Sequence, residues 1–128
     1  MMIELEGKLL SQPVSILVYS GACLIYVNPK LVEICKLKSH KFKTSWLVQL
    51  ATRAKRKLCA KIPNYTLEIS EQQLTVDLKI LPFGSYNVLL GMDWFQKHRT
   101  LVDCIENIIY YRMQDGTLKE VQGIKKPL

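Results

Sequence analysis

The stretch LVYSGA at residues 17–22 holds a candidate nucleophile, Ser20, where an apolar run meets small residues. A serine nucleophile needs a general base within hydrogen-bond reach, usually a histidine. The two histidines, His40 and His98, are distant from Ser20 in sequence and stand in charged segments typical of a surface. We therefore expect Ser20 to stabilise its loop through a hydrogen bond rather than to act as a nucleophile.

Cysteines and histidines could also hold a metal ion, but their spacing argues against it. Cys23, Cys35, Cys59 and Cys104 lie too far apart to form a C-x-x-C pair. We expect no metal and no cofactor. There is no apolar signal segment at the N-terminus and no run near the ~18 apolar residues that a membrane-spanning helix requires. This predicts a cytoplasmic chain with reduced thiols and no membrane partner.

The length and composition predict one globular domain over residues 1–128, since 48% of the 128 residues are apolar and 23% are charged. The formal net charge is +7, which favours acidic partners. It allows weak, non-specific and salt-sensitive binding of nucleic acid. A solvated lysine-rich surface explains the charge more simply, because no aromatic residues alternate with the basic ones.

The elements that must position these residues are mostly strands. Alternation and β-branched residues predict strands at 3–10, 14–18, 46–51, 58–62, 65–69, 74–81 and 86–90, and again within 102–121. In the strand 74–81, the alternation places Leu74, Val76, Leu78 and Ile80 on one buried face.

Two short helices are also expected. One covers 29–37, with Leu31, Ile34 and Cys35 on one face, and the other covers 92–98. Many short strands with two brief helices predict a small, mostly antiparallel closed β barrel.

Two segments share one form, because LVYSGA (17–22) and VLLGMDW (88–94) each run from an apolar strand into a small-residue turn. Together with PKLVEI (29–34), SWLVQLA (45–51), LPFGSYNVLLGMDWF (81–95) and VQGI (121–124), in this order, they resemble the retropepsin-like aspartic protease domain of gypsy-type LTR retrotransposons. The similarity extends over nearly the whole chain, and LLGMDW is its most specific part.

The resemblance implies a mostly β, retropepsin-like acid-protease barrel and a protomer that becomes an enzyme only as a homodimer. It places the catalytic loop at Tyr19, Ser20, Gly21 and Ala22. It implies a flap at about 47–62, with Leu50, Ala51, Thr52 and Arg53 at its tip, that closes over an extended polypeptide substrate. The segment 88–98 would support the catalytic loop through Leu89, Leu90, Gly91 and Asp93, so that Asp93 is structural rather than catalytic.

Two residues depart from the family pattern. Tyr19 stands at the position of the catalytic aspartate, and a phenol is neutral at pH 7, so the attacking water would lack its general base. Arg53 stands where the family usually has glycine, and it removes the conformational freedom of the flap tip.

We therefore predict a Gag-Pol-type aspartic endopeptidase domain that is catalytically disabled, located in the cytoplasm or in a virus-like particle. The alternative is a pseudoprotease that serves for dimerisation or peptide binding.

Overall fold

The structure is a computed structural model that describes residues 2–49, 55–81 and 86–124, the side chains of 42–46, 48–49 and 56–59 excepted. It contains ten strands and two short helices among these residues. The strands are β1 (Met2–Leu9), β2 (Gln12–Tyr19), β3 (Ile25–Val27), β4 (His40–Gln49), β5 (Lys55–Ile69), β6 (Gln72–Ile80), β7 (Val88–Leu90), β8 (Leu101–Asp103), β9 (Ile108–Arg112) and β10 (Leu118–Gln122). The helices are α1 (Pro29–Ile34) and α2 (Met92–Lys97).

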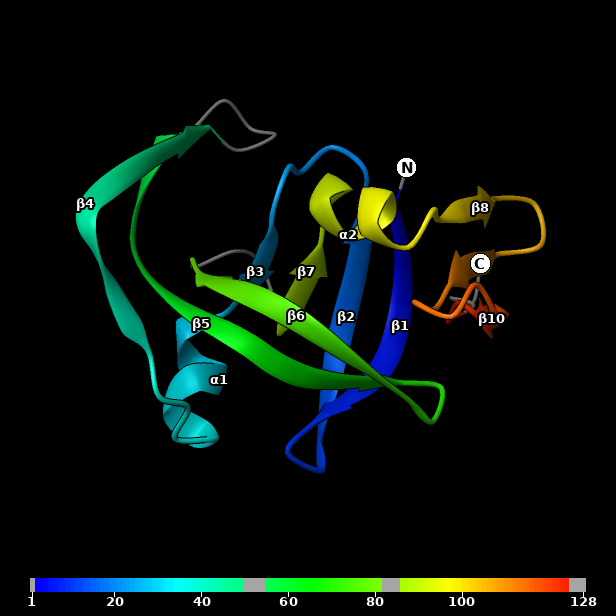
Figure 1. Ribbon diagram of the computed structural model, residues 1–128, viewed down its shortest axis with the longest axis horizontal. Coiled ribbons are helices and arrows are strands. Elements are labelled where there is room, and N and C mark those ends of the chain that lie inside the picture. Colours follow the sequence, from blue (N-terminus) through cyan, green and yellow to red (C-terminus); the bar gives the residue numbers. More distant parts are fainter. Residues whose placement is uncertain (1, 50–54, 82–85, 125–128) are drawn as a thin grey trace.

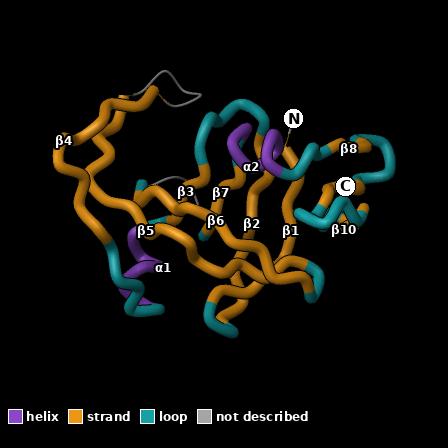
Figure 2. The backbone as a smooth tube through the Cα atoms, in the orientation of Figure 1, coloured by secondary structure: helices purple, strands orange, loops and turns teal. Residues whose placement is uncertain are grey.

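Six strands close into a barrel in the order β1-β2-β7-β3-β6-β5, because β1 pairs with β5 at residues 7–9 and 67–69. The predicted closed barrel with two short helices is confirmed (Figures 1 and 2). Among the described strands, β4 pairs with β5 alone, and the β4–β5 hairpin extends away from the barrel (Figure 1). The flap expected at 47–62 falls on this hairpin, while its expected tip, Leu50 to Arg53, lies outside the described residues.

A second sheet of three strands, in the order β10-β9-β8, follows α2 and lies beside the barrel (Figure 1). Its middle strand contributes Ile109 and Tyr111 to the main hydrophobic core. The chain then returns to the barrel, where the N–H of Ile124 donates to the backbone oxygen of Glu4 at 2.8 Å. The C-terminal sheet is therefore packed against the barrel, and the segment that follows β10 is hydrogen-bonded to β1.

The core follows the alternation expected from the sequence. On β6, Leu74, Val76 and Leu78 are buried while Thr75 and Asp77 are exposed. The same alternation on neighbouring strands fills the interior of the barrel, where an apolar side chain contributes about 1.5–3 kcal/mol when it is fully buried. No helix in the described part of the chain is long and apolar enough to cross a membrane.

Two local expectations are wrong. The first helix ends at Ile34, and Ile34 is 68% exposed rather than packed beside Leu31. The reason is that the chain reverses at Lys36, which has a positive φ of 51°, and this turn brings Leu37 into the core instead. The strands expected at 58–62 and 65–69 are one strand, β5, whose register with β6 shifts between Ile62 and Tyr65.

Candidate functional site

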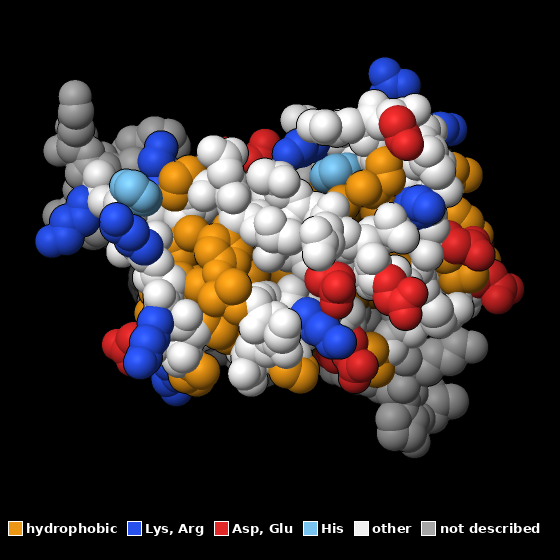
Figure 3. All heavy atoms as spheres, turned by 60° about the horizontal axis from the view of Figure 1, so that its bottom comes forward, with side chains coloured by type: hydrophobic (Ala, Val, Ile, Leu, Met, Phe, Trp, Pro, Cys, Tyr) orange, Lys and Arg blue, Asp and Glu red, His pale blue; other side chains and the backbone are white. Residues whose placement is uncertain are grey.

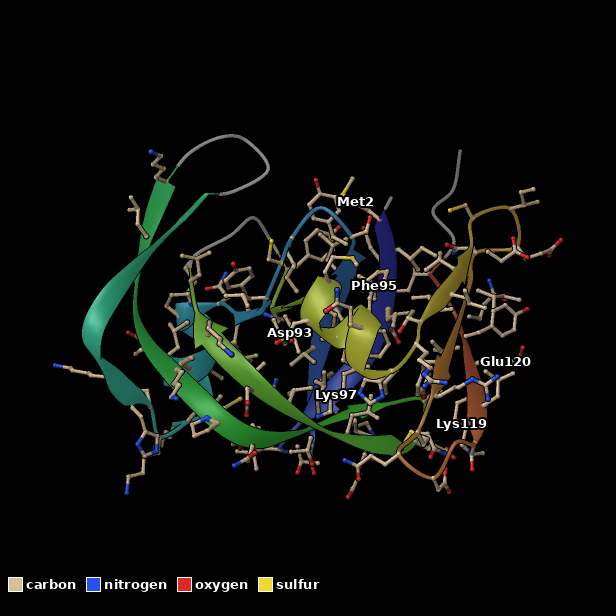
Figure 4. The ribbon with its side chains drawn as sticks, turned by 45° about the horizontal axis from the view of Figure 1, so that its top comes forward. Met2, Asp93, Phe95, Lys97, Lys119 and Glu120 are labelled. Atoms are coloured by element: carbon tan, nitrogen blue, oxygen red, sulfur yellow. The ribbon has the colours of Figure 1, made fainter. Side chains whose placement is uncertain are left out.

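Tyr19 is the last residue of β2, and residues 20–24 form the loop that leads to β3. The N–H of Ala22 donates to the backbone oxygen of Tyr19 at 3.4 Å, which closes a turn. The half-buried Tyr19 ring lies over Gly21, where an added Cβ would be 2.2 Å from the phenol oxygen. A side chain at position 21 would therefore require the Tyr19 ring to move. Met2, which pairs with Tyr19 in the register of β1 and β2, is labelled at the end of β1 in Figure 4.

The segment around Gly91 holds this loop from the other side. The N–H of Met92 donates to the oxygen of Ala22 at 2.8 Å, and the N–H of Asp93 donates to the oxygen of Cys23 at 2.9 Å. A Cβ on Gly91 would lie 2.4 Å from the backbone oxygen of Leu24 and 2.6 Å from that of Ala22. The close approach of the two backbones thus requires glycine at position 91.

β7 carries this segment into the site by inserting between β2 and β3. It runs parallel to β2, with Leu17 opposite Leu89, and antiparallel to β3, with Tyr26 opposite Leu89. Leu90 is fully buried in the main core and directly precedes Gly91. The structure thus brings Leu89, Leu90 and Gly91 together with the Tyr19 loop, although they are some 70 residues apart in sequence.

A polar contact at the start of β7, which sequence reasoning missed, fixes its register. The Oδ1 atom of Asn87 accepts the N–H of Ser15 at 2.8 Å, and the N–H of Asn28 donates to the oxygen of Asn87 at 2.9 Å. Asn87 therefore connects β2 to the residue that caps α1. The only signal in the sequence is an asparagine directly before an apolar run, which is too common to be recognised.

Four apolar residues form a second cluster, separate from the main core, that we call the outer apolar cluster: Leu17, Tyr26, Leu81 and Leu89. Their strand neighbours Ile16, Val18, Ile25, Val27, Val88 and Leu90 all lie in the main core. Because side chains alternate along a strand, the cluster occupies the opposite face of β2, β7 and β3. Tyr19, Ala22, Leu24 and Tyr86 pack at its edge. The site therefore combines the Tyr19 loop with a buried apolar cluster whose edge residues are half-buried.

Burial raises the pKa of Tyr26 above 10, with a smaller contribution from Cys23. This keeps the phenol of Tyr26 neutral and suits its place among apolar side chains. The sequence did not reveal the cluster, because strands that are covered on both faces show continuous apolar runs instead of alternation.

Asp93 is exposed in the first turn of α2 (Figure 4), a position where a carboxylate complements the positive end of the helix dipole. Asp103 is the last residue of β8, and its Oδ1 atom accepts the N–H groups of Ile105 and Glu106, each at 3.0 Å. Asp93 is thus placed to interact with the dipole of α2, and Asp103 accepts backbone hydrogen bonds in the turn after β8.

The expectation that His98 lies at the surface is wrong, because His98 is only 4% exposed. It stacks on Trp94, with ring centroids 5.2 Å apart, and Tyr111 packs against both rings. Its Nδ1 atom is 2.9 Å from the oxygen of Arg112, and burial lowers its pKa from 6.5. Trp94 is fully buried. His98 belongs to the junction between α2 and the C-terminal sheet.

The described residues contain no group of three or more His, Cys, Asp or Glu side chains that could hold a metal ion. Cys23, Cys35 and Cys104 are free thiols. The chemistry that the site can offer thus depends on Tyr19, the loop backbone and the outer apolar cluster.

Comparison with known proteins gives two positive results. Residues 4–117 match the model of a family described as retroviral aspartyl protease. The fold resembles the crystal structure of the retroviral protease-like domain of Ddi1 from Leishmania major, with a TM-score of 0.71 and 15% sequence identity, over 98% of this chain and 95% of that one. No curated protein matches the sequence.

Proposed function

The chain belongs to the retroviral aspartyl protease family, and we propose that it is the single protease domain of a retrotransposon polyprotein in which Tyr19 has replaced the catalytic aspartate. It binds extended polypeptide but does not cleave it. The observation that carries this proposal is the position of Tyr19, which ends β2 within a loop that the Gly91 segment holds through two backbone hydrogen bonds.

Peptide hydrolysis in this family requires two carboxylates that share one proton, one from each protomer. The ionised carboxylate takes a proton from the attacking water, and the protonated one polarises the scissile carbonyl. A phenol that is neutral at pH 7 cannot take the first role. Two copies of Tyr19 therefore leave the water without a general base, while the surrounding loop keeps its form.

Peptide binding has separate support. The outer apolar cluster lies on the same face as Tyr19. Its four members are at most 9% exposed, so a peptide on this face would contact the half-buried residues at its edge, Tyr19, Ala22, Leu24 and Tyr86. The β4–β5 hairpin extends from the barrel where a flap would close over it (Figure 1). Neither feature depends on a carboxylate at position 19. Retention of binding without hydrolysis is therefore the function that this arrangement supports best.

We propose a homodimer that is weaker than that of an active relative. Two tyrosines would meet at an axis suited to two aspartates, and overpacking of a tight site typically costs about 1–3 kcal/mol. Sedimentation measurements should show monomer at nanomolar and dimer at higher concentration, and a tight dimer at nanomolar concentration would contradict the expected crowding. The proposed setting is the cytoplasm or a virus-like particle.

The test is to restore the carboxylate. Tyr19→Asp should gain cleavage of extended apolar peptides at mildly acidic pH, about 10²-fold or more above the matched control Tyr19→Phe, which is also neutral. Arg53→Gly, added to Tyr19→Asp, should increase cleavage further if a freer flap closes better. The wild-type chain should bind these peptides without cutting them.

Two results would contradict the proposal. The first is cleavage by the wild-type chain that a statine-type inhibitor blocks, because it would mean that Tyr19 does not prevent catalysis. The second is a Tyr19→Asp, Arg53→Gly variant that is folded and dimeric yet cuts no peptide in a broad library. That outcome would mean that position 19 is not the displaced catalytic position.

A further inference from the structure

The C-terminal sheet and its flanking turns expose an unusual share of apolar surface. Four of the eight large apolar side chains that are exposed in the described part of the chain lie between residues 101 and 124. Leu101 on β8 is 68% exposed, Leu118 on β10 is 54% exposed, and Ile105 in the turn after β8 is 94% exposed. A single exposed leucine is common on soluble proteins, but a contiguous apolar patch marks an interaction site.

The strand register places these side chains next to one another. Leu101 is opposite Tyr110 on β9, and Tyr110 is opposite Glu120 on β10. Leu118, two residues before Glu120, is the diagonal neighbour of Tyr110 and lies within reach of its ring. Tyr111 is fully buried in the core, so Tyr110 points the other way. We call this side the outer face of the C-terminal sheet, and its apolar members are Leu101, Ile108, Tyr110 and Leu118.

The charged groups of the outer face are mainly acidic. Glu120 is exposed in the middle of β10, and Asp103 is half-buried at the end of β8. Arg112 belongs to the same face, but its Nη1 atom donates to the backbone oxygen of Gly116 at 3.2 Å, which holds it at the hairpin end. Residues 101–124 include four acidic and two basic residues, although the net charge of the whole chain is +7. The outer face is therefore an apolar and acidic surface on a basic protein.

The same separation of charge extends over the molecule. Figure 3 shows basic side chains gathered at the end where β4 and β5 lie, while acidic side chains are more frequent toward the other end, near hydrophobic ones. The C-terminal sheet lies at this second end (Figure 1). A positively charged partner is therefore attracted to the end that carries the outer face and repelled by the opposite end.

The charges of the outer face select among the possible occupants. A second copy that stacks on this face through a two-fold axis would bring Asp103 and Glu120 of both copies into one interface, because such an interface uses the same patch twice. Nucleic acid and anionic membranes would meet the same carboxylates. An apolar and basic polypeptide complements both the leucines and the acidic groups.

We infer that the outer face of the C-terminal sheet docks an extended segment of another protein in which basic residues accompany apolar ones. Alternate side chains of an extended segment point to the same side and lie about 7 Å apart. A leucine over Tyr110 and Leu101 therefore places a lysine two residues further on beside Glu120. This surface is formed by β8, β9 and β10, whereas the Tyr19 site is formed by β2, β7 and β3. The inference goes beyond the proposed function and does not depend on it.

The test uses three fluorescent peptides of equal length. The first has a leucine and a lysine on the same side of each extended repeat, the second has glutamate in place of lysine, and the third has serine in place of leucine. Fluorescence polarisation should show that the wild-type chain binds the leucine–lysine peptide at least tenfold more tightly than either of the others. Added salt should weaken this binding.

Variants of the outer face locate the binding. The double variant Leu101→Ser, Leu118→Ser should bind the leucine–lysine peptide at least tenfold more weakly, because it removes most of the exposed apolar surface. Glu120→Gln should weaken binding about two- to fivefold, as expected for one exposed ion pair. Glu120→Lys should reverse the preference, so that the leucine–glutamate peptide binds more tightly than the leucine–lysine peptide.

Two matched controls lie on other turns. Leu10 is 63% exposed in the turn between β1 and β2, and Glu71 is exposed in the turn between β5 and β6. Leu10→Ser and Glu71→Gln should both bind as the wild type does. All of these positions except Asp103 and Tyr110, which are left unchanged, carry exposed side chains, and circular dichroism should confirm that each variant is folded.

Three results would overturn the inference. The first is equal binding of the leucine–lysine and leucine–glutamate peptides, and the second is an affinity that the double variant keeps. The third is self-association in sedimentation, or binding to phosphatidylserine vesicles, that the wild type shows and the double variant loses. In that case a second copy or a membrane covers the outer face instead of a basic segment.

Discussion

Substitution of Gly91 by alanine tests whether the Gly91 segment holds the Tyr19 loop. The new Cβ would lie 2.4 Å from the backbone oxygen of Leu24, where a carbon–oxygen contact needs about 3.3 Å. One backbone must therefore move by nearly 1 Å, which disrupts the hydrogen bonds from Met92 to Ala22 and from Asp93 to Cys23. Two such bonds contribute about 2 kcal/mol, and overpacking costs about 1–3 kcal/mol. We expect Gly91→Ala to lower the free energy of unfolding by about 3–5 kcal/mol.

The assay is urea unfolding with linear extrapolation, together with hydrogen exchange at the amides of Met92 and Asp93. Gly116→Ala is the matched control, because a Cβ at Gly116 meets nothing within 4 Å and only its positive φ of 86° is unfavourable. That control should cost about 1–2 kcal/mol. If Gly91→Ala costs no more than Gly116→Ala and leaves the two amides protected, the reasoning that this segment supports the site is refuted.

Two further predictions concern the junction of α2 with the C-terminal sheet. Burial lowers the pKa of His98 from 6.5, so the unfolded chain binds a proton at this histidine more tightly than the folded chain does. The free energy of unfolding should therefore fall as the pH decreases below about 6.5. Urea unfolding at several pH values should show that the free energy of unfolding depends less on pH in His98→Gln than in the wild type. The buried hydroxyl of Tyr111 has no hydrogen-bond partner among the residues that the structure describes, so Tyr111→Phe should be neutral or stabilising by up to about 1 kcal/mol. A clear loss of stability in thermal melting would reveal a partner such as a buried water.

The local part of the fold could be predicted because it depends on short-range patterns. The alternation of LTVDLKIL is typical of a strand with one buried face, and the structure confirms it for β6. The apolar run before Gly91 predicted a strand followed by a helix, and these elements are β7 and α2 in the structure. The strand-rich pattern and the resemblance to a known family together predicted the closed barrel, which the structure confirms.

The features that could not be predicted depend on contacts between residues far apart in sequence. His98 stands between lysine and arginine in the sequence, yet Trp94 and Tyr111 bury it. The register that places Tyr26 opposite Lys79, and Lys79 opposite Lys61, forms only when β3, β6 and β5 pair. No local pattern specifies these pairings, because the sequence shows which residues favour strands but not which strands will be neighbours.

The insertion of β7 between β2 and β3 also determines the order in which the molecule can fold. β2 and β3 do not pair with each other, and only β7 (88–90) connects them within the sheet. The residues of β7 lie 72 positions after their partners on β2 in the sequence. Hairpins such as β1–β2 close short loops and form early, whereas closing a loop of this length is entropically costly and slow. A chain that ends before β7 therefore lacks Leu89 and the Gly91 segment and cannot complete the Tyr19 site or the outer apolar cluster.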